Sequence, residues 1–170
     1  MLGFLFRTLT AEPERGAELF EALTAEARMP HWYVAGGAPD TIDGRFAILA
    51  TLTALALVRL EHAGEVGELA SVALTERFIH VMEVEHRELG LGDPKLGRTV
   101  RRLVGSLARR TELWRSAATG ERDWNDAARE SVYKADAAPA HLAHSAERLR
   151  AFWSRLQDVS VSALEEGRIR

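Results

Sequence analysis

The sequence contains no cysteine among its 170 residues. This excludes a disulfide-stapled scaffold and a thiolate metal site, and it fits a reducing compartment. Charged residues make up 28% and hydrophobic residues 46% of the chain, which is typical of an ordinary globular protein rather than a disordered one. We therefore predict one cytoplasmic domain over residues 1–170, with residues 1–11 as a loosely ordered N-terminal extension.

Hydrophobic runs of membrane-spanning length are also missing. The stretch FAILATLTALALV is uncharged but covers only residues 46–58, whereas a spanning helix needs about twenty apolar residues. The N-terminal run MLGFLF has neither the charged region nor the cleavage site of a signal peptide. We predict that residues 46–60 form a buried central helix, and that any membrane contact is peripheral, at the inner membrane, through Phe4, Leu5 and Phe6.

Strand-like alternation is absent, and the apolar residues recur instead at helical spacing. Asp40 or Thr41 caps the central helix, Gly64 ends it, and Pro139 opens the last one. These signals predict an all-α fold, a single compact helical domain of about six helices around the central one. The predicted helices span residues 13–29, 41–61, 65–89, 94–118, 123–134 and 139–166.

Sequence motifs of catalysis and metal binding are scarce. No phosphate-binding loop, dinucleotide fingerprint, nucleophile elbow or His-Glu-x-x-His occurs. Glu83 and His86 form one Glu-x-x-His element of a di-iron bundle, which requires a second copy that the chain lacks. His141 and His144 are a helical turn apart without a third ligand nearby. We predict no catalytic residue, metal, cofactor or small-molecule substrate, with an unrecognised helical enzyme as an alternative.

Acidic residues are almost absent from one segment. Residues 94–115 carry seven basic side chains and one acidic side chain, a balance of +6, whereas residues 1–93 have a balance of −8 and residues 116–170 of −1. A basic patch within an acidic protein favours a specific docking surface over general affinity for nucleic acid.

The basic segment also divides into two faces at helical spacing. Asp93 and Pro94 form a helix start signal. One face is apolar, with Leu96, Val100, Leu103, Val104, Leu107 and Trp114. The opposite face has Lys95, Arg98, Arg102 and Arg109, with Arg101 and Arg110 at its edges. Because only Glu112 is available for pairing within the helix, we predict that these six cations bind a partner; a solvated face is the alternative.

A loop rich in glycine and proline, MPHWYVAGGAPD, carries two neighbouring aromatic residues, Trp32 and Tyr33. Aromatic side chains in such a loop either anchor it on the core or form a landing point for a partner. We include both residues in the predicted partner-binding site.

Two blocks of the chain resemble the ubiquinol–cytochrome c chaperone family, the bacterial relatives of the mitochondrial assembly factors for the cytochrome bc1 complex. In the first, AEARMPHWYVAGGAPDTIDGRFAILATLTALALVRL is similar to an aromatic loop that leads through PDT-x-DGRF into a long apolar helix. In the second, MEVEHRELGLGDPKLGRTVRRLV is similar to a Gly-rich hinge followed by a basic helix. The chain departs from the family pattern at His86, where a leucine is usual, and over residues 107–110.

The resemblance implies an all-α, non-catalytic assembly factor that binds a membrane-protein client such as cytochrome b. It also implies further partners: a small helical co-chaperone, the ribosome or a membrane surface. A row of cations suits anionic lipid, RNA or an acidic protein equally. The alternative function is therefore an RNA- or ribosome-binding module that acts through residues 94–115.

Overall fold

The computed structural model describes residues 15–88, 90, 93–133 and 137–169. Over this part of the chain the fold is all-α, as predicted, and no strand occurs. The helices are α2 (Ala17–Ala27), α3 (Ile42–Glu61), α4 (Gly64–Glu88), α5 (Asp93–Ala118), α6 (Trp124–Val132), α7 (Pro139–Asp158) and α8 (Val161–Glu165), with a 3-10 turn at Pro30–Trp32. The predicted extension at residues 1–11 lies outside the described residues.

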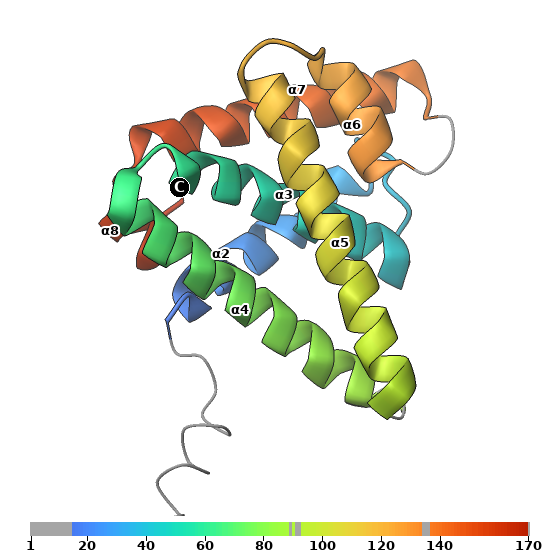
Figure 1. The fold of residues 1–170 in the computed structure, drawn as a ribbon. Helices are drawn as coiled ribbons and strands as arrows, with labels where there is room; N and C mark the ends of the chain where they lie inside the picture. The colour runs from blue at the N-terminus through green and yellow to red at the C-terminus, as the bar shows by residue number, and fades with distance from the viewer. Residues whose placement is uncertain (1–14, 89, 91–92, 134–136, 170) are drawn as a thin grey trace, which may run out of the picture.

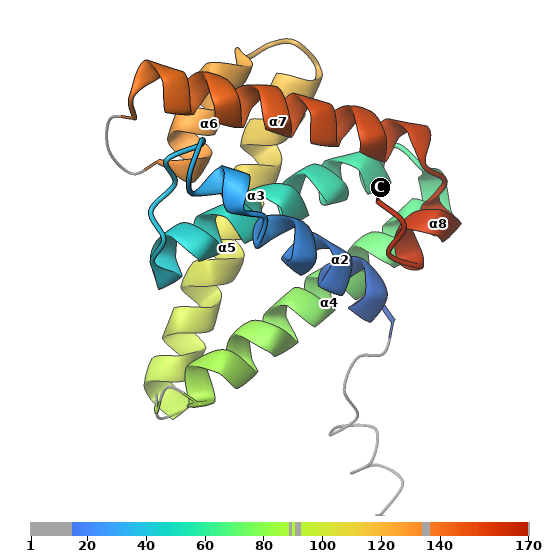
Figure 2. The same cartoon turned by 180° about the vertical axis from the view of Figure 1, so that it is seen from behind.

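The apolar helix α3 is the centre of the fold, as the sequence predicts. It contacts α2, α4, α5, α6 and α7, and residues 50–58 are all buried. Figure 1 and Figure 2 show α6 and α7 on one side of α3, α2 and α4 on the other, and α5 crossing it. None of the described helices is long and apolar enough to cross a bilayer.

Local capping explains where several helices begin. The Thr41 hydroxyl accepts a hydrogen bond from the Gly44 backbone N–H (3.2 Å), which confirms one of the two predicted caps of α3. Asp123 caps α6 in the same way. Gly64, the first residue of α4, adopts a positive φ of 62°, a backbone conformation that residues with side chains rarely take.

Three hydroxyl and indole groups buried around α3 satisfy one another. The Trp114 indole donates to Ser131 Oγ (3.0 Å), which lies 2.6 Å from Thr51 Oγ1, and Thr51 donates to the Ala47 carbonyl (2.7 Å). Since the Thr51 proton is used on Ala47, the Ser131 hydroxyl donates to Thr51. These hydrogen bonds tie α5 and α6 to α3, and each of the three polar side chains has a partner.

The prediction of one continuous last helix over residues 139–166 was wrong. The structure has two helices, α7 and α8, separated near Ser160, whose hydroxyl caps α8. The Arg59 guanidinium of α3 donates to the carbonyls of Leu156 (2.9 Å) and Val159 (3.0 Å) at the end of α7. These bonds satisfy carbonyls that a terminated helix leaves free, and α8 turns back onto α2 and α4.

The position of α3 leads to a first prediction. Leu52 and Leu55 are 0% exposed, so an aspartate at either position leaves an unpaired carboxylate in the core. That burial costs several kcal/mol against a total stability of roughly 5–15 kcal/mol. We expect Leu52→Asp and Leu55→Asp to abolish cooperative thermal unfolding measured by circular dichroism.

The matched control lies on the same helix. Ile42 is 74% exposed in the first turn of α3, where an acidic residue suits the helix dipole. Ile42→Asp should therefore melt close to the wild type. A folded Leu52→Asp variant with an unchanged melting temperature would show that α3 is not the core.

Candidate functional site

Helix α5 has the two faces that its sequence predicts. Five of its predicted apolar residues are buried: Leu96, Val100, Leu103, Leu107 and Trp114. Val104 is half-buried. These side chains pack α5 onto α3 and α4. The opposite face is consequently left to solvent.

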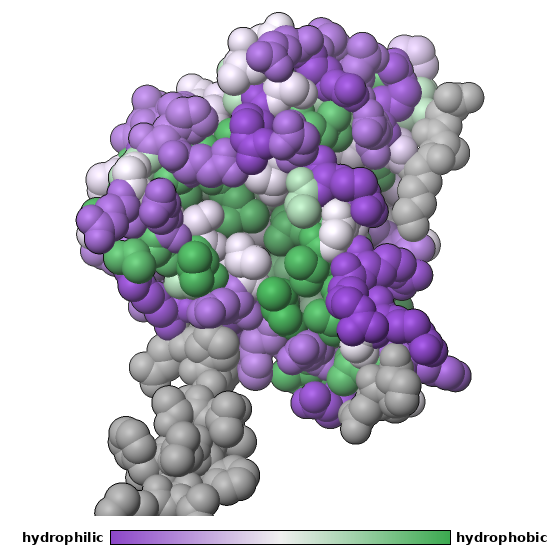
Figure 3. Space-filling model, viewed as in Figure 1, coloured by the Kyte–Doolittle hydropathy of each residue, from purple (hydrophilic) through white to green (hydrophobic). Residues whose placement is uncertain are grey.

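Five cations cover this outer face, and we name them the cationic row: Lys95, Arg98, Arg101, Arg102 and Arg109. All five are exposed, and none forms an ion pair or hydrogen bond with another described residue. In Figure 3 hydrophilic surface follows the outer edge of α5. The row is thus a set of neighbouring positive charges. No described residue neutralises them, and they are exposed to solvent.

Arg110 differs from the cationic row. It donates to the Ser131 carbonyl (2.8 Å) and to Ser106, and its guanidinium lies 5.9 Å from the centre of the Phe46 ring. Burial lowers the pKa of Arg110. Because its side chain joins α5 to α6 and α3, Arg110 has a structural role in the fold, and its binding of a partner stays a prediction.

Arg115, near the end of the same helix, also has an internal role. Its guanidinium pairs with Glu61 (2.7 Å) at the end of α3 and with Glu112. Hydrogen bonding to Glu61 raises the pKa of Arg115. The basic segment therefore contains two structural arginines beside the row of unpaired ones.

The two loop aromatic residues also take different positions. Trp32 is 0% exposed, and its indole donates to the Glu26 carbonyl (2.9 Å). Trp32 therefore anchors the loop on the core, one of the two roles considered for it from the sequence, and its binding of a partner stays a prediction. Tyr33 is half-buried, donates to the Ala27 carbonyl (2.6 Å), and remains accessible from a neighbouring groove.

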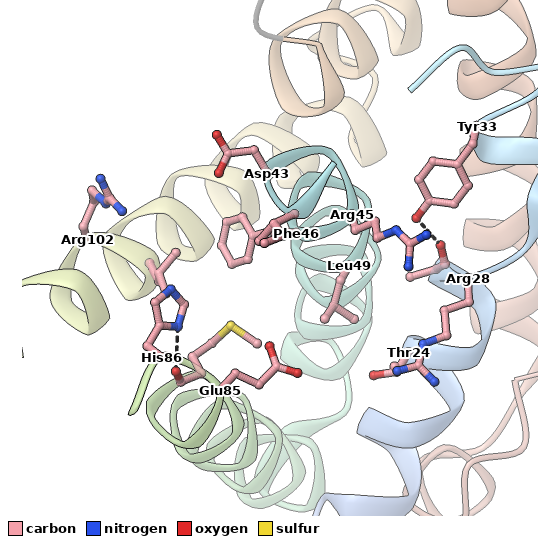
Figure 4. Close-up of a pocket in the computed structure, with 14 residues that line it drawn as sticks. Thr24, Arg28, Tyr33, Asp43, Arg45, Phe46, Leu49, Glu85, His86 and Arg102 are labelled. Atoms are coloured by element: carbon pink, nitrogen blue, oxygen red, sulfur yellow. Dashed lines mark hydrogen bonds between the residues drawn. The ribbon is translucent and has the colours of Figure 1, made fainter. Parts of the chain in front are cut away.

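That groove was not predicted. It has a volume of about 300 Å³ and is formed by α2, α3, α4, α5 and the aromatic loop. Phe46, Leu49, Met82 and Leu103 supply apolar walls. Figure 4 shows Arg102 on one side and Tyr33, Arg28 and Arg45 on the other. Since Arg102 belongs to the cationic row, the row borders this groove.

Charge inside the groove is mixed. Arg45 pairs with Asp40 (2.7 Å), while Asp43 and Glu85 contribute carboxylates. The His86 Nδ1 atom lies 2.8 Å from the Met82 carbonyl oxygen, so the histidine of the Glu-x-x-His element is engaged with its own helix. Within the described ranges, no group of three or more His, Cys, Asp or Glu side chains could hold a metal ion.

A histidine pair links the aromatic loop to α7. The Nδ1 atom of His31 lies 3.3 Å from Nε2 of His144, and the His31 ring stacks against Trp32 with 4.4 Å between ring centres. Burial, together with the charge of Arg148, lowers the pKa of His31 from 6.5 to about 4. The folded protein therefore favours a neutral imidazole at this position.

Comparison with known proteins places these features in a family. A family model described as "Ubiquinol-cytochrome C chaperone" matches residues 35–170. The chain belongs to this family, which was the resemblance stated from its sequence. The match includes the central helix α3, the cationic row and all later elements.

One solved structure gives independent support for the fold. The crystal structure of the Cbp3 homolog from Brucella abortus aligns with a TM-score of 0.77 and 22% identity, covering 98% of this chain and 94% of that one. At this identity the likeness shows a shared fold. The comparison with curated proteins gives no match.

The histidine pair generates a second prediction. Unfolded His31 titrates near 6.5 and folded His31 at about 4, so the unfolded state binds the proton first on acidification. The stability that neutral His31 contributes is complete above pH 6.5 and is lost as the pH falls towards 4. We expect the melting temperature to fall over this window, and His31→Gln to fall less steeply than the wild type.

Carboxylic acids in general also titrate at the lower end of this pH range. The quantity to measure is therefore the difference in melting temperature between the wild type and His31→Gln. Thermal melts at half-unit pH intervals give it directly. Parallel melting curves for wild type and His31→Gln would contradict the assignment of this pH dependence to His31.

Proposed function

We propose that this chain is a non-catalytic assembly factor for the cytochrome bc1 complex and that it binds a membrane-protein client, cytochrome b. Membership of the ubiquinol–cytochrome c chaperone family supports the assembly role. We propose that it acts in the cytoplasm, at the surface of the inner membrane, where such a client is inserted. A small helical co-chaperone is a further proposed partner.

The observation that carries the proposal is the unpaired cationic row. Exposed charges contribute well under 1 kcal/mol each to stability, and like charges on adjacent turns repel one another. The row therefore does little for folding. Several unpaired cations on one rigid helix do, however, accelerate and orient an electrostatic encounter. We infer that the row is a docking surface for a partner.

The groove beside the row supports a protein partner. It places apolar side chains next to Arg102, and apolar contacts bordered by charges are the usual composition of a protein interface. Pure phosphate recognition requires no such apolar surface. We accordingly favour a protein client, with ribosomal RNA and anionic lipid as the competing partners that experiment must separate.

A third prediction tests the row. Arg98→Glu, Arg102→Glu and Arg109→Glu change exposed residues that form no hydrogen bond or ion pair with another described residue, so the triple variant should keep its helical content and melt near the wild type. Client capture should fail because the sign of the docking surface is reversed. We expect reduced bc1 activity when this variant replaces the wild-type protein in cells.

A second triple variant controls for net charge. Arg122, Arg129 and Arg168 are exposed and form surface ion pairs with Glu130, Asp126 and Glu166, which are worth little energetically. Changing these three to glutamate alters the net charge by the same amount away from α5 and should preserve bc1 activity. Full bc1 activity of the α5 triple variant would show that the row is only a solvated helix face and not a docking surface.

Mass spectrometry of the proteins and RNA bound to the purified wild-type chain then separates the competing functions. Cytochrome b that is present with the wild type and lost with the α5 variant supports the proposal. Ribosomal components alone would support the RNA-binding alternative, and a stoichiometric metal would support an enzyme.

A further inference from the structure

Helix α4 exposes apolar side chains that no other part of the described structure covers. Val66, Leu69 and Val72 are 54%, 50% and 57% exposed. Their spacing of three residues places them along one side of the N-terminal half of α4. In Figure 3 hydrophobic surface gathers over this half of the helix. We name these three residues the α4 stripe.

Carboxylates surround the α4 stripe. Glu65, Glu68 and Glu76 are exposed, and none of them forms an ion pair with another described residue. Positions 65, 69, 72 and 76 fall on one helix face, since they are spaced by four, three and four residues. Glu65 and Glu76 thus lie at the two ends of the apolar contact, about 16 Å apart at 1.5 Å per residue.

An apolar surface with acidic ends selects its partner by charge. An anionic lipid surface is repelled by three unpaired carboxylates. An apolar segment flanked by lysine or arginine is attracted at both ends, and lysine and arginine are in excess at the cytoplasmic ends of membrane helices. We propose that the α4 stripe binds an apolar helical segment of the client with basic residues at its ends.

This inference rests on the proposed function for the identity of the client, but it concerns a different surface. Figure 1 shows α4 and α5 on the same side of the molecule. The cationic row and the α4 stripe therefore present opposite charges on neighbouring helices. A client that engages both surfaces would place an acidic part on the cationic row and a basic part on the α4 stripe. Such a client is held in one orientation, because the reverse orientation would place like charges together.

Two synthetic peptides test the proposal without the natural client. Both have a 14-residue helical core of leucine and alanine, one with two lysines at each end and the other with two glutamates. We expect the purified full chain to bind the lysine-flanked peptide at least tenfold more tightly in fluorescence anisotropy. Equal affinity for both peptides, or no binding, would overturn the proposal.

Variants of the full chain then locate the binding surface. Glu65→Lys with Glu76→Lys should reverse the preference between the two peptides. Leu69→Ser with Val72→Ser should weaken binding of the lysine-flanked peptide at least tenfold. Val34→Ser, at another exposed apolar position (79% exposed), is the matched control and should leave binding unchanged. Binding that survives the Leu69→Ser and Val72→Ser changes in a folded protein would place the peptide elsewhere.

Other occupants of the stripe give distinct results. A second copy of the chain would appear as a dimer in analytical ultracentrifugation that Leu69→Ser with Val72→Ser dissociates. If the chain's own apolar residues 2–6 occupy the stripe, deleting them should raise the affinity for the lysine-flanked peptide at least tenfold. Either result overturns the assignment of the stripe to a client.

The proposed function has its own readout, so the two failures differ. If neither peptide binds the α4 stripe but the α5 triple variant loses bc1 activity, the inference about α4 fails and the assembly role stands. If both peptide preferences hold but the wild-type chain captures ribosomal components alone, the α4 site is real and the assembly role fails.

Discussion

Helix α3 is buried along most of its length, and its burial determines where the other helices pack. A helix whose residues 50–58 are all buried must be surrounded, and α2, α4, α5, α6 and α7 all contact it. Its threonines are tolerated because Thr51 is bonded to Ala47 and Ser131, and Thr53 to the Leu49 carbonyl. The surrounding helices need only one apolar face each, which leaves their outer faces free for other roles.

The arginines on these helices form two groups, which differ in whether the guanidinium group is hydrogen-bonded within the fold. Arg59, Arg110 and Arg115 each join two or more helices through hydrogen bonds to carbonyl or carboxylate oxygens. The cationic row on α5 makes no such bond within the described structure. Since both kinds occur in one basic segment, charge alone does not identify a docking residue. The decisive property is whether the rest of the fold supplies a partner.

Local patterns predicted much of this structure, and contacts between distant segments account for what they missed. The two faces of α5 and the Thr41 cap follow from residues within a few turns of one another. Arg110 looked like the other arginines, because only the position of Ser131 on α6 shows that it is engaged. The break after α7 is tied to Arg59, about 100 residues away, and the groove is assembled from α2, α3, α4 and α5.

We propose that the outer face of α5 meets the client, and site-specific crosslinking in respiring cells would detect that contact. A photoreactive amino acid replaces Arg98 or Arg109 on α5, and in control proteins it replaces Arg122 or Arg129, which are exposed elsewhere on the surface. We expect adducts with cytochrome b from positions 98 and 109 and none from the controls. Adducts from the control positions alone, or only ribosomal adducts from α5, would contradict it.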